Sequence, residues 1–192
     1  MKINMFTRNI FSIGITTLQL TNLDNDYLYE EVKKLQNRDN KDLVRFMDLN
    51  SPSLNLLNAI VLEKSKSILE DSLLNTSAEV YIKRAWGNHN FNSDICIPHT
   101  HRNSFLSAVY YPKATDAKIH FYSPWADTLL SHVPTDKPKQ FNEYNSSYYE
   151  LYVKTGMLVI FPAHLPHFVP VSKDDRCSIA YDIDVKRKPE VE

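Results

Sequence analysis

The hydrophobic pattern changes its period near position 78, and this change constrains the fold more than any other feature of the sequence. Before it, apolar residues recur at helical spacing in two segments, residues 22–40 and 54–74. After it, short runs rich in β-branched and aromatic residues are bounded by Pro, Asn, Asp or Gly. Helices followed by strands predict an α+β fold in which a β-sandwich or small barrel forms the C-terminal part of the chain.

Several segments are predicted to be strands. Residues 11–20, which contain Gly14, are polar enough for an edge strand that precedes the helices. The strands after the helices are expected at residues 78–86, 104–111, 118–122, 157–161 and 176–185. Residues 88–94 are predicted to be a polar loop. Residues 124–149 form a long polar connection, which is our candidate for a lid over a site.

Composition and charge indicate one folded domain and exclude several classes of protein. The 192 residues carry 22 Lys+Arg and 23 Asp+Glu, so no general attraction to nucleic acid or to an anionic membrane is expected. With 43% hydrophobic residues, the chain can bury a core without disulfides, and Cys96 and Cys177 are expected to be free thiols of a reducing, cytoplasmic compartment. Neither a membrane span nor a signal peptide is apparent. The expected organisation is a single domain over residues 1–192, with an N-terminal strand and supporting helices in 1–77, a β-rich core in 78–185 and a polar tail in 186–192.

Three of the seven histidines stand in a pattern that suits metal binding. His99 and His101 are two positions apart, and on a strand such side chains point to the same face, so both imidazoles can reach one ion. His167, from a neighbouring strand, would complete one face of an octahedron or three corners of a tetrahedron. A His-x-His pair alone is a weak signal, because surface strands often carry polar residues at this spacing.

Arg176 adds a second element to this pattern, nine positions after His167. If the two segments form adjacent antiparallel strands, Arg176 lies deep behind His167 on the same face as Ser178 and Ala180. A guanidinium buried among apolar side chains is costly unless an anion meets it, and its planar fork suits a carboxylate. Imidazoles at the mouth of a barrel, with an arginine beneath them, are what a metal-chelating dicarboxylate requires.

Together these segments resemble the Fe(II)/2-oxoglutarate-dependent oxygenases. The resemblance rests on four stretches of sequence: PHTHRNSFLSAVYY, GMLVIFP, HFVP and RCS. The most similar group is a small family of oxygenases from phages and marine bacteria that resembles the prolyl hydroxylases. The resemblance implies a double-stranded β-helix, or jelly roll, over residues 78–185, with flanking N-terminal helices.

The same resemblance implies roles for individual residues. His99 and His167 match metal ligands, and Arg176 matches the residue that pairs with the far carboxylate of 2-oxoglutarate. Tyr111 and Ser178 fall where hydrogen bonds to this co-substrate are usually made. The implied cofactors are Fe(II), 2-oxoglutarate and O2, and the implied reaction hydroxylates a C–H bond while 2-oxoglutarate is decarboxylated to succinate. The substrate, a peptide, a prolyl residue or a small molecule, stays open, and the N-terminal strand could pair with a second copy of the chain.

One position departs from the pattern of the family. The usual motif is His-x-Asp or His-x-Glu, and His101 stands where the carboxylate belongs. We expect His101 to be the third ligand, and the alternative is a carboxylate from elsewhere, such as Asp94. A neutral imidazole in place of a carboxylate leaves the site one charge more positive.

Two other functions fit part of the pattern. Three histidines also suit a zinc enzyme with an activated water, or an iron enzyme that does not use 2-oxoglutarate, but such a site has no need for Arg176. A non-catalytic jelly-roll binding module with a vestigial site is the other alternative. The remaining histidines are expected in a loop near the site (His164), on a solvated strand (His120) and in loops (His89 and His132). Further candidates for the lining of the pocket are Trp86, Asn88 and Phe105.

Overall fold

The computed structural model describes residues 12–36, 51–73, 78–90, 96–124, 146–171 and 175–187. In these ranges it contains two helices and nine strands, and neither helix is long and apolar enough to cross a membrane. In chain order the elements are β1 (Thr16–Gln19), α1 (Asn25–Gln36), α2 (Pro52–Leu73), β2 (Ala78–Asn90), β3 (Cys96–His99), β4 (Leu106–Lys113), β5 (Ala117–Tyr122), β6 (Tyr148–Val153), β7 (Met157–Pro162), β8 (His167–Val169) and β9 (Arg176–Arg187).

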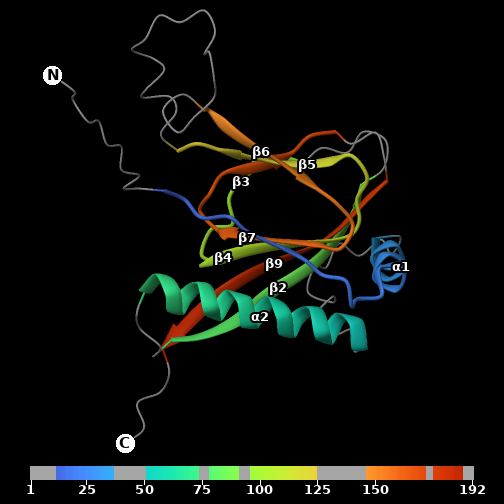
Figure 1. Cartoon of the computed structure of the whole chain (residues 1–192), viewed down its shortest axis with the longest axis horizontal. Helices are drawn as coiled ribbons and strands as arrows, with labels where there is room; N and C mark the ends of the chain where they lie inside the picture. The colour runs from blue at the N-terminus through green and yellow to red at the C-terminus, as the bar shows by residue number, and fades with distance from the viewer. Residues whose placement is uncertain are drawn as a thin grey trace, which may run out of the picture.

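The strands form two antiparallel sheets that face each other (Figure 1). The five-stranded sheet has the order β1-β7-β4-β9-β2, and the four-stranded sheet has the order β3-β8-β5-β6. From β2 onward, successive strands alternate between the sheets, except that β5 and β6 pair with each other. Strands distant in sequence therefore become neighbours, and β9, the last strand, lies between β2 and β4.

The five-stranded sheet is buried on both faces. One face packs on the helices in a helix-side core, where Leu28 of α1 and Val61 of α2 meet Tyr110 of β4. The opposite face packs on the four-stranded sheet in an inter-sheet core, which contains Tyr111 of β4 and Phe121 of β5. Successive residues of a strand point to opposite faces, so a central strand such as β4 is apolar and buried along nearly its whole length.

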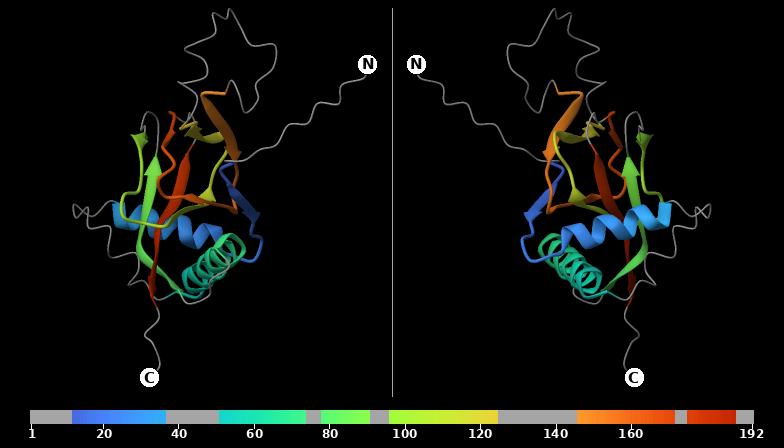
Figure 2. Two further views of the ribbon diagram at one scale, coloured as in Figure 1. Left: turned by 90° about the vertical axis from the view of Figure 1, so that its left-hand side faces the viewer. Right: turned by 90° about the vertical axis from the view of Figure 1, so that its right-hand side faces the viewer.

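Both helices begin at a side-chain cap. The Tyr27 N–H donates to Asp24 Oδ1 (2.9 Å), and the Leu54 N–H donates to Ser51 Oγ (3.1 Å). Each cap satisfies a backbone donor that the first turn of a helix leaves without a partner. Figure 2 shows that α1 and α2 run in different directions beside the strands, and together they cover the outer face of the five-stranded sheet.

A β-bulge at Lys83 changes the face to which the side chains of β2 point. The register with β9 shifts between Ile82 and Arg84, so that Lys83 is an extra residue. An inserted residue turns the following side chains to the other face of the sheet. Accordingly, Ile82 packs against the helix-side core, whereas Trp86, beyond the bulge, packs against the inter-sheet core.

Most of the predicted elements are confirmed. The edge strand expected in residues 11–20 is β1, at the edge of the five-stranded sheet, and both helices form where expected. The loop expected at residues 88–94 is wrong for residues 88–90, because β2 continues its pairing with β9 as far as Asn90. The long connection is shorter than expected, because Tyr148 and Tyr149 belong to β6. Residues 125–145, most of the proposed lid, lie outside the described residues.

Gly87 lies at a close approach of α1 to β2. A Cβ at this position would lie 2.8 Å from both γ-methyl groups of the buried Val32. We therefore expect Gly87→Ala to lower the free energy of unfolding by about 1–3 kcal/mol, the usual cost of overpacking a core. The measurement is urea denaturation. The control is Gly14→Ala, where the added Cβ has no neighbour within 4 Å, and equal stability of the two variants would contradict the close approach.

Candidate metal centre and pocket

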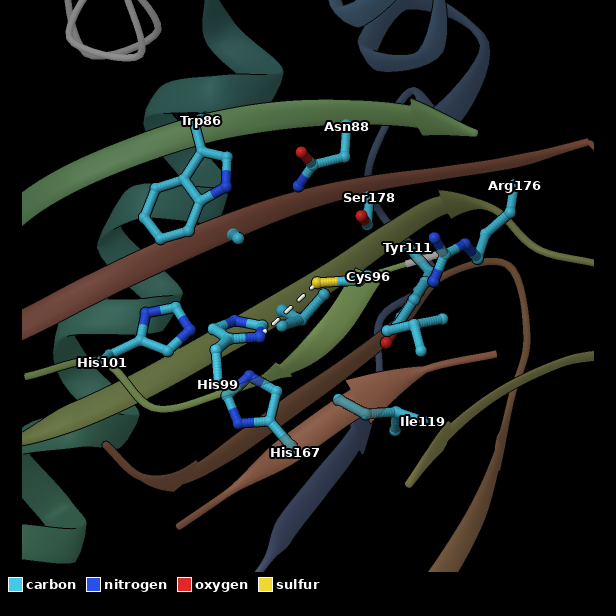
Figure 3. Close-up of a pocket in the computed structure, with 13 residues that line it drawn as sticks. Trp86, Asn88, Cys96, His99, His101, Tyr111, Ile119, His167, Arg176 and Ser178 are labelled. Carbon is cyan, nitrogen blue, oxygen red and sulfur yellow. Dashed lines mark hydrogen bonds between the residues drawn. The ribbon is translucent and has the colours of Figure 1, made fainter. Parts of the chain in front are cut away.

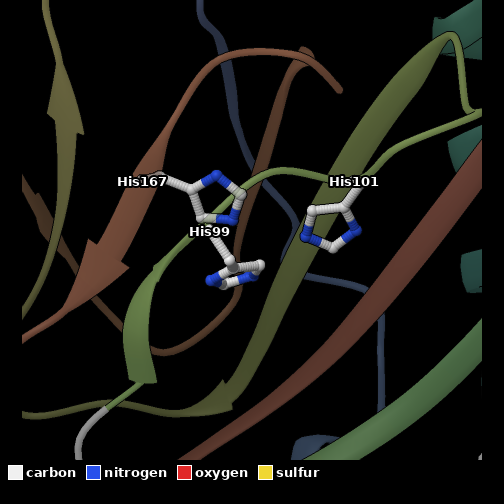
Figure 4. A group of neighbouring side chains, drawn as sticks. All are labelled: His99, His101 and His167. Carbon is white, nitrogen blue, oxygen red and sulfur yellow. The ribbon is translucent and has the colours of Figure 1, made fainter.

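His99, His101 and His167 converge in the space between the two sheets (Figure 4). One candidate ligand atom from each residue lies within 4.8 Å of the other two. His99 ends β3 and His167 begins β8, and the two residues face each other in the register of these paired strands. His101 and His167 are buried, and His99 is partly buried. Three imidazoles thus surround a single point, as a metal ion requires.

The local structure around His101 differs from the expectation. We predicted that His99 and His101 lie on one strand, with both side chains on the same face, but β3 ends at His99. His101 follows the strand, and its N–H donates to the carbonyl of Ala163 (2.9 Å). This backbone bond fixes the turn that brings the His101 ring to the other two rings.

Each of the three imidazoles is anchored at its Nδ1. The oxygen atoms facing Nδ1 are the carbonyl of Ile97 for His99 (2.8 Å), the carbonyl of Leu165 for His167 (2.9 Å) and Asp182 Oδ1 for His101 (2.5 Å). Carbonyl and carboxylate oxygens only accept hydrogen bonds, so each Nδ1 holds the proton and each Nε2 keeps its lone pair. Such outer hydrogen bonds are the usual support of metal-binding histidines.

The protonation of His167 and His99 is shaped by their surroundings. Burial lowers the pKa of His167 to about 4, so its imidazole is neutral near pH 7, as metal binding requires. At His99, a hydrogen bond with Cys96 Sγ (3.6 Å from Nδ1) raises the pKa, assisted by the Ile97 carbonyl.

Asp182 is a buried carboxylate behind His101. Arg84 donates to its Oδ2 through Nε (2.7 Å) and through Nη2, while its Oδ1 faces His101. Burial alone would raise the pKa of Asp182, but the hydrogen bonds from His101 and Arg84 lower it below its usual value. Asp182 is therefore an anion in contact with the candidate metal centre.

Opposite the histidines, the pocket is lined by Arg176, Ser178 and Tyr111 (Figure 3). Arg176 is buried, and Ser178 and Ala180 line the pocket with it, as the alternation along the strand predicts. The hydroxyl of Tyr111 is buried and has no hydrogen-bond partner among the described residues. Burial raises the pKa of Tyr111, against the opposing charge of Arg176, so the hydroxyl keeps its proton. The pocket thus offers donors at the end away from the imidazoles.

The relation between His167 and Arg176 also differs from the expectation. Their strands are not neighbours: β8 pairs with β3 and β5, whereas β9 pairs with β2 and β4 in the other sheet. Arg176 therefore faces the pocket from the sheet opposite His167. The connection between β8 and β9 is short enough for a hairpin, but the two strands join different sheets.

Asp175 ties the start of β9 to three other elements. It accepts hydrogen bonds from Tyr29 Oη of α1 (2.5 Å) and Lys113 Nζ of β4 (2.8 Å), and its Oδ1 lies 2.5 Å from His89 Nε2 of β2. Burial alone would raise the pKa of Asp175, but Lys113, Tyr29 and His89 lower it to about 2. Since Arg176 is the next residue, these contacts hold its backbone in place.

The other candidates from the sequence are placed as follows. Trp86 and Asn88 line the pocket, whereas Phe105 packs against the helix-side core. Cys96 and Cys177 are free thiols, as predicted, and Cys96 lines the pocket. His164 is exposed in a turn. His120 of β5 pairs with Glu150 (3.0 Å). The loop predicted for His89 is wrong, because this residue lies in β2. Asp94 and His132 lie outside the described residues.

Sequence reasoning missed Asp182 and Arg84, although a signal for Asp182 was present. Arg176, Ser178 and Ala180 were placed on one face of a strand, and the same alternation puts Asp182 on that face as well. An acidic residue at an inward position of an otherwise apolar strand indicates a polar partner.

The pocket between the two sheets has three imidazoles at one end and a buried arginine at the other. This arrangement agrees with the Fe(II)/2-oxoglutarate-dependent oxygenases that the sequence resembles. The family model described as "Putative 2OG-Fe(II) oxygenase" matches residues 84–182, more than half of the chain. The chain belongs to this family. Comparison with curated proteins gives no match.

Solved structures of the same fold share little sequence with this chain. A Pseudomonas putida prolyl-4-hydroxylase is 13% identical with a TM-score of 0.57, and the match covers 92% of this chain and 89% of that chain. AviO1 from Streptomyces viridochromogenes Tue57 is 11% identical with a TM-score of 0.61, covering 94% and 92%. HygX from Streptomyces hygroscopicus, with nickel and 2-oxoglutarate bound, is 10% identical with a TM-score of 0.57, covering 90% and 82%. At these identities the likeness shows the fold alone.

The contacts of Asp175 predict a pH-dependent contribution to stability. Its folded pKa of about 2 lies below the value of about 3.9 of a free aspartate. The stabilisation is therefore complete above pH 4 and is lost as the pH falls toward 2. We expect Asp175→Asn to lower the free energy of unfolding by roughly 1–2 kcal/mol at pH 6, and the difference from wild type to shrink between pH 4 and 2.

The measurement for Asp175 is urea denaturation across this pH range. The matched control is Asp116→Asn, at an exposed position with a positive φ that asparagine also tolerates. A difference between wild type and Asp175→Asn that stays constant from pH 6 to 2 would contradict the assignment.

Proposed function

We propose that this protein is an Fe(II)- and 2-oxoglutarate-dependent oxygenase that hydroxylates a C–H bond of a small molecule or a peptide while 2-oxoglutarate is decarboxylated to succinate. The observation that supports it is one pocket with two ends: three imidazoles anchored at Nδ1, and a buried arginine with a donor hydroxyl opposite them. A zinc site has no need of the second end.

The proposal includes the jelly-roll form of the fold. The five-stranded sheet contains the order β2-β9-β4-β7, and the other sheet has the order β3-β8-β5-β6. Eight strands in two facing antiparallel sheets, which alternate between the sheets except at the β5–β6 pair, support a double-stranded β-helix.

The donor set fits Fe(II), for which imidazole is a suitable ligand. His99, His101 and His167 would hold the ion through Nε2, because their Nδ1 atoms are engaged elsewhere. When bound, Fe(II) supplies the redox chemistry with O2 that the protein side chains cannot perform. The chain itself positions the three ligands through their Nδ1 contacts, and burial keeps His167 neutral.

Arg176, Tyr111 and Ser178 would bind the far carboxylate of 2-oxoglutarate. The Arg176 guanidinium offers planar donors suited to a carboxylate, and the Tyr111 hydroxyl is a buried donor for which the described residues provide no acceptor. A buried hydroxyl without a partner costs on the order of 1–3 kcal/mol. A carboxylate at this place would remove that cost.

Aromatic side chains pack against two of the imidazoles. Trp86 stacks on His101 with ring centroids 5.5 Å apart, and Phe161 meets His167 edge-on at 4.7 Å. These contacts hold the planes of the His101 and His167 rings.

Two similar structures support the cofactor assignment and one class of substrate. HygX is described with nickel and 2-oxoglutarate bound, which agrees with a metal and a 2-oxo acid in this fold. The Pseudomonas putida relative is a prolyl-4-hydroxylase, so prolyl peptides are the first substrates to test here. Fold similarity does not by itself select a substrate.

The proposed function is tested by anaerobic titration of the apo-protein with Fe(II) and then with 2-oxoglutarate. We expect a weak charge-transfer band in the visible spectrum that appears only when both are present. Zinc retained through purification, with no such band, would favour the hydrolytic alternative. A protein that binds neither metal nor 2-oxoglutarate would favour a binding module.

Variants at the arginine end of the pocket are expected to affect the binding of 2-oxoglutarate but not the binding of the metal. Arg176→Met removes the anion partner but leaves the imidazoles, so metal affinity should stay near that of wild type while the Kd for 2-oxoglutarate rises roughly 10- to 100-fold. Calorimetry on the metal-loaded protein measures both affinities. An unchanged Kd for 2-oxoglutarate would remove Arg176 from the co-substrate site.

Tyr111→Phe tests the hydroxyl without changing the packing of the ring. We expect the Kd for 2-oxoglutarate to rise by about 3- to 10-fold, the usual effect of one hydrogen bond. Tyr122→Phe is the matched control, because Tyr122 is exposed and does not line the pocket. The same Kd in both variants would exclude a contact between Tyr111 and the co-substrate.

A further inference from the structure

We infer that Asp182 is a positioning residue of the metal centre, which supplies through His101 the negative charge that a carboxylate ligand supplies in the usual His-x-Asp or His-x-Glu motif. The inference rests on the proposed function and deepens it. It concerns the position at which this chain differs from that usual motif, since His101 stands where the motif has the carboxylate.

The two carboxylate oxygens of Asp182 have different partners. Oδ1 lies 2.5 Å from His101 Nδ1, and Oδ2 accepts both hydrogen bonds from Arg84. The Asp182 side chain is only 1% exposed. It projects from β9, where the register places it opposite Arg84 of β2 and Ser107 of β4. The carboxylate therefore has one fixed orientation, with Oδ1 toward the imidazole.

This contact determines the tautomer of His101. A carboxylate accepts hydrogen bonds and donates none, so the His101 proton is held on Nδ1 and Nε2 is left as the ligand atom. An anion at this distance also makes the imidazole a stronger donor toward a metal ion. At Nδ1, His167 faces the carbonyl oxygen of Leu165, and His99 faces the carbonyl oxygen of Ile97 and the Cys96 sulfur. Among the three histidines, His101 is thus the one whose Nδ1 faces a carboxylate.

Arg84 and Trp86 form a second set of contacts that support the orientation of the His101 ring. The Arg84 guanidinium carbon lies 5.5 Å from the centroid of the Trp86 ring, which in turn stacks on His101 at 5.5 Å with an interplanar angle of 20°. The Arg84 side chain is 47% exposed, so water screens its positive charge. The negative charge of Asp182 on the buried side, toward His101, is screened much less.

The alternative is that Asp182 and Arg84 form only a structural ion pair. Asp182→Asn distinguishes the two, because Arg84 still points its donors at the former Oδ2. The amide carbonyl is expected to turn to Arg84 and the amide NH2 to His101 Nδ1. His101 would then accept at Nδ1 and carry its proton on Nε2, the wrong tautomer for a ligand, in a site of unchanged shape.

The experiment compares the wild type, Asp182→Asn, Arg84→Met and the double variant, each as the full chain. Co(II) binding to the apo-proteins is followed by its visible absorption, and ¹⁵N NMR of labelled apo-protein reports which nitrogen of His101 carries the proton. We expect Asp182→Asn to weaken Co(II) binding by 10- to 100-fold and to move the proton to Nε2. Arg84→Met should weaken Co(II) binding less than Asp182→Asn does, because the carboxylate can still accept from His101 Nδ1 through either oxygen. In the double variant the amide is free to turn its oxygen to His101, so part of the affinity should return.

Each outcome bears on a different claim. The inference would be overturned if wild type and folded Asp182→Asn bind Co(II) equally well. It would also be overturned if the double variant recovers no affinity and His101 has the same tautomer in the variants as in wild type. Either result would leave only a structural ion pair. A proton on Nε2 of His101 in wild type would overturn it without any variant, even if Asp182→Asn does not fold. Failure of the wild type itself to bind Co(II) would instead overturn the proposed metal centre.

Discussion

The pairing of β9 with β2 on one side and β4 on the other is the interaction on which the site depends. Because β9 is central, successive side chains are committed to opposite faces. Cys177, Ile179 and Tyr181 enter the helix-side core, while Arg176 and Ser178 line the pocket. The same strand thus supplies both apolar packing on the helices and the polar end of the pocket. A shift of one residue in this pairing would exchange the two faces.

The sequence predicted the parts of the site that depend on local patterns. The helical spacing, the edge strand and the pair His99 and His101 each follow from residues close together in the chain. The contacts of Asp175 were not predictable in this way, because Tyr29, His89 and Lys113 come from three distant elements. The placement of Arg176 opposite His167 required knowledge of which sheet each strand joins, and no local period contains that information.

The short strands show the same limit in another form. β3 and β8 contain only a few residues each and owe their conformation to pairing with each other and, for β8, with β5. Propensity has little effect over such a length, whereas tertiary pairing dominates. The two histidines at their facing ends come together because of this pairing. This also explains how solved structures only 10–13% identical to the chain can share its fold: the pairing of strands fixes the architecture, and many apolar sequences satisfy it.

The bulge at Lys83 has a consequence for how the chain tolerates change. Before the bulge, Ile82 of β2 packs against the helix-side core, and after it, Trp86 packs against the inter-sheet core and lines the pocket. Deletion of a single residue here would keep the strand and its composition but would turn Arg84 away from Asp182 and Trp86 away from His101. A change in the length of β2 would thus reorient every side chain beyond it, whereas a substitution acts at one position. We expect the number of residues between Ala78 and Asn90 to be under stronger selection than the identity of most of them.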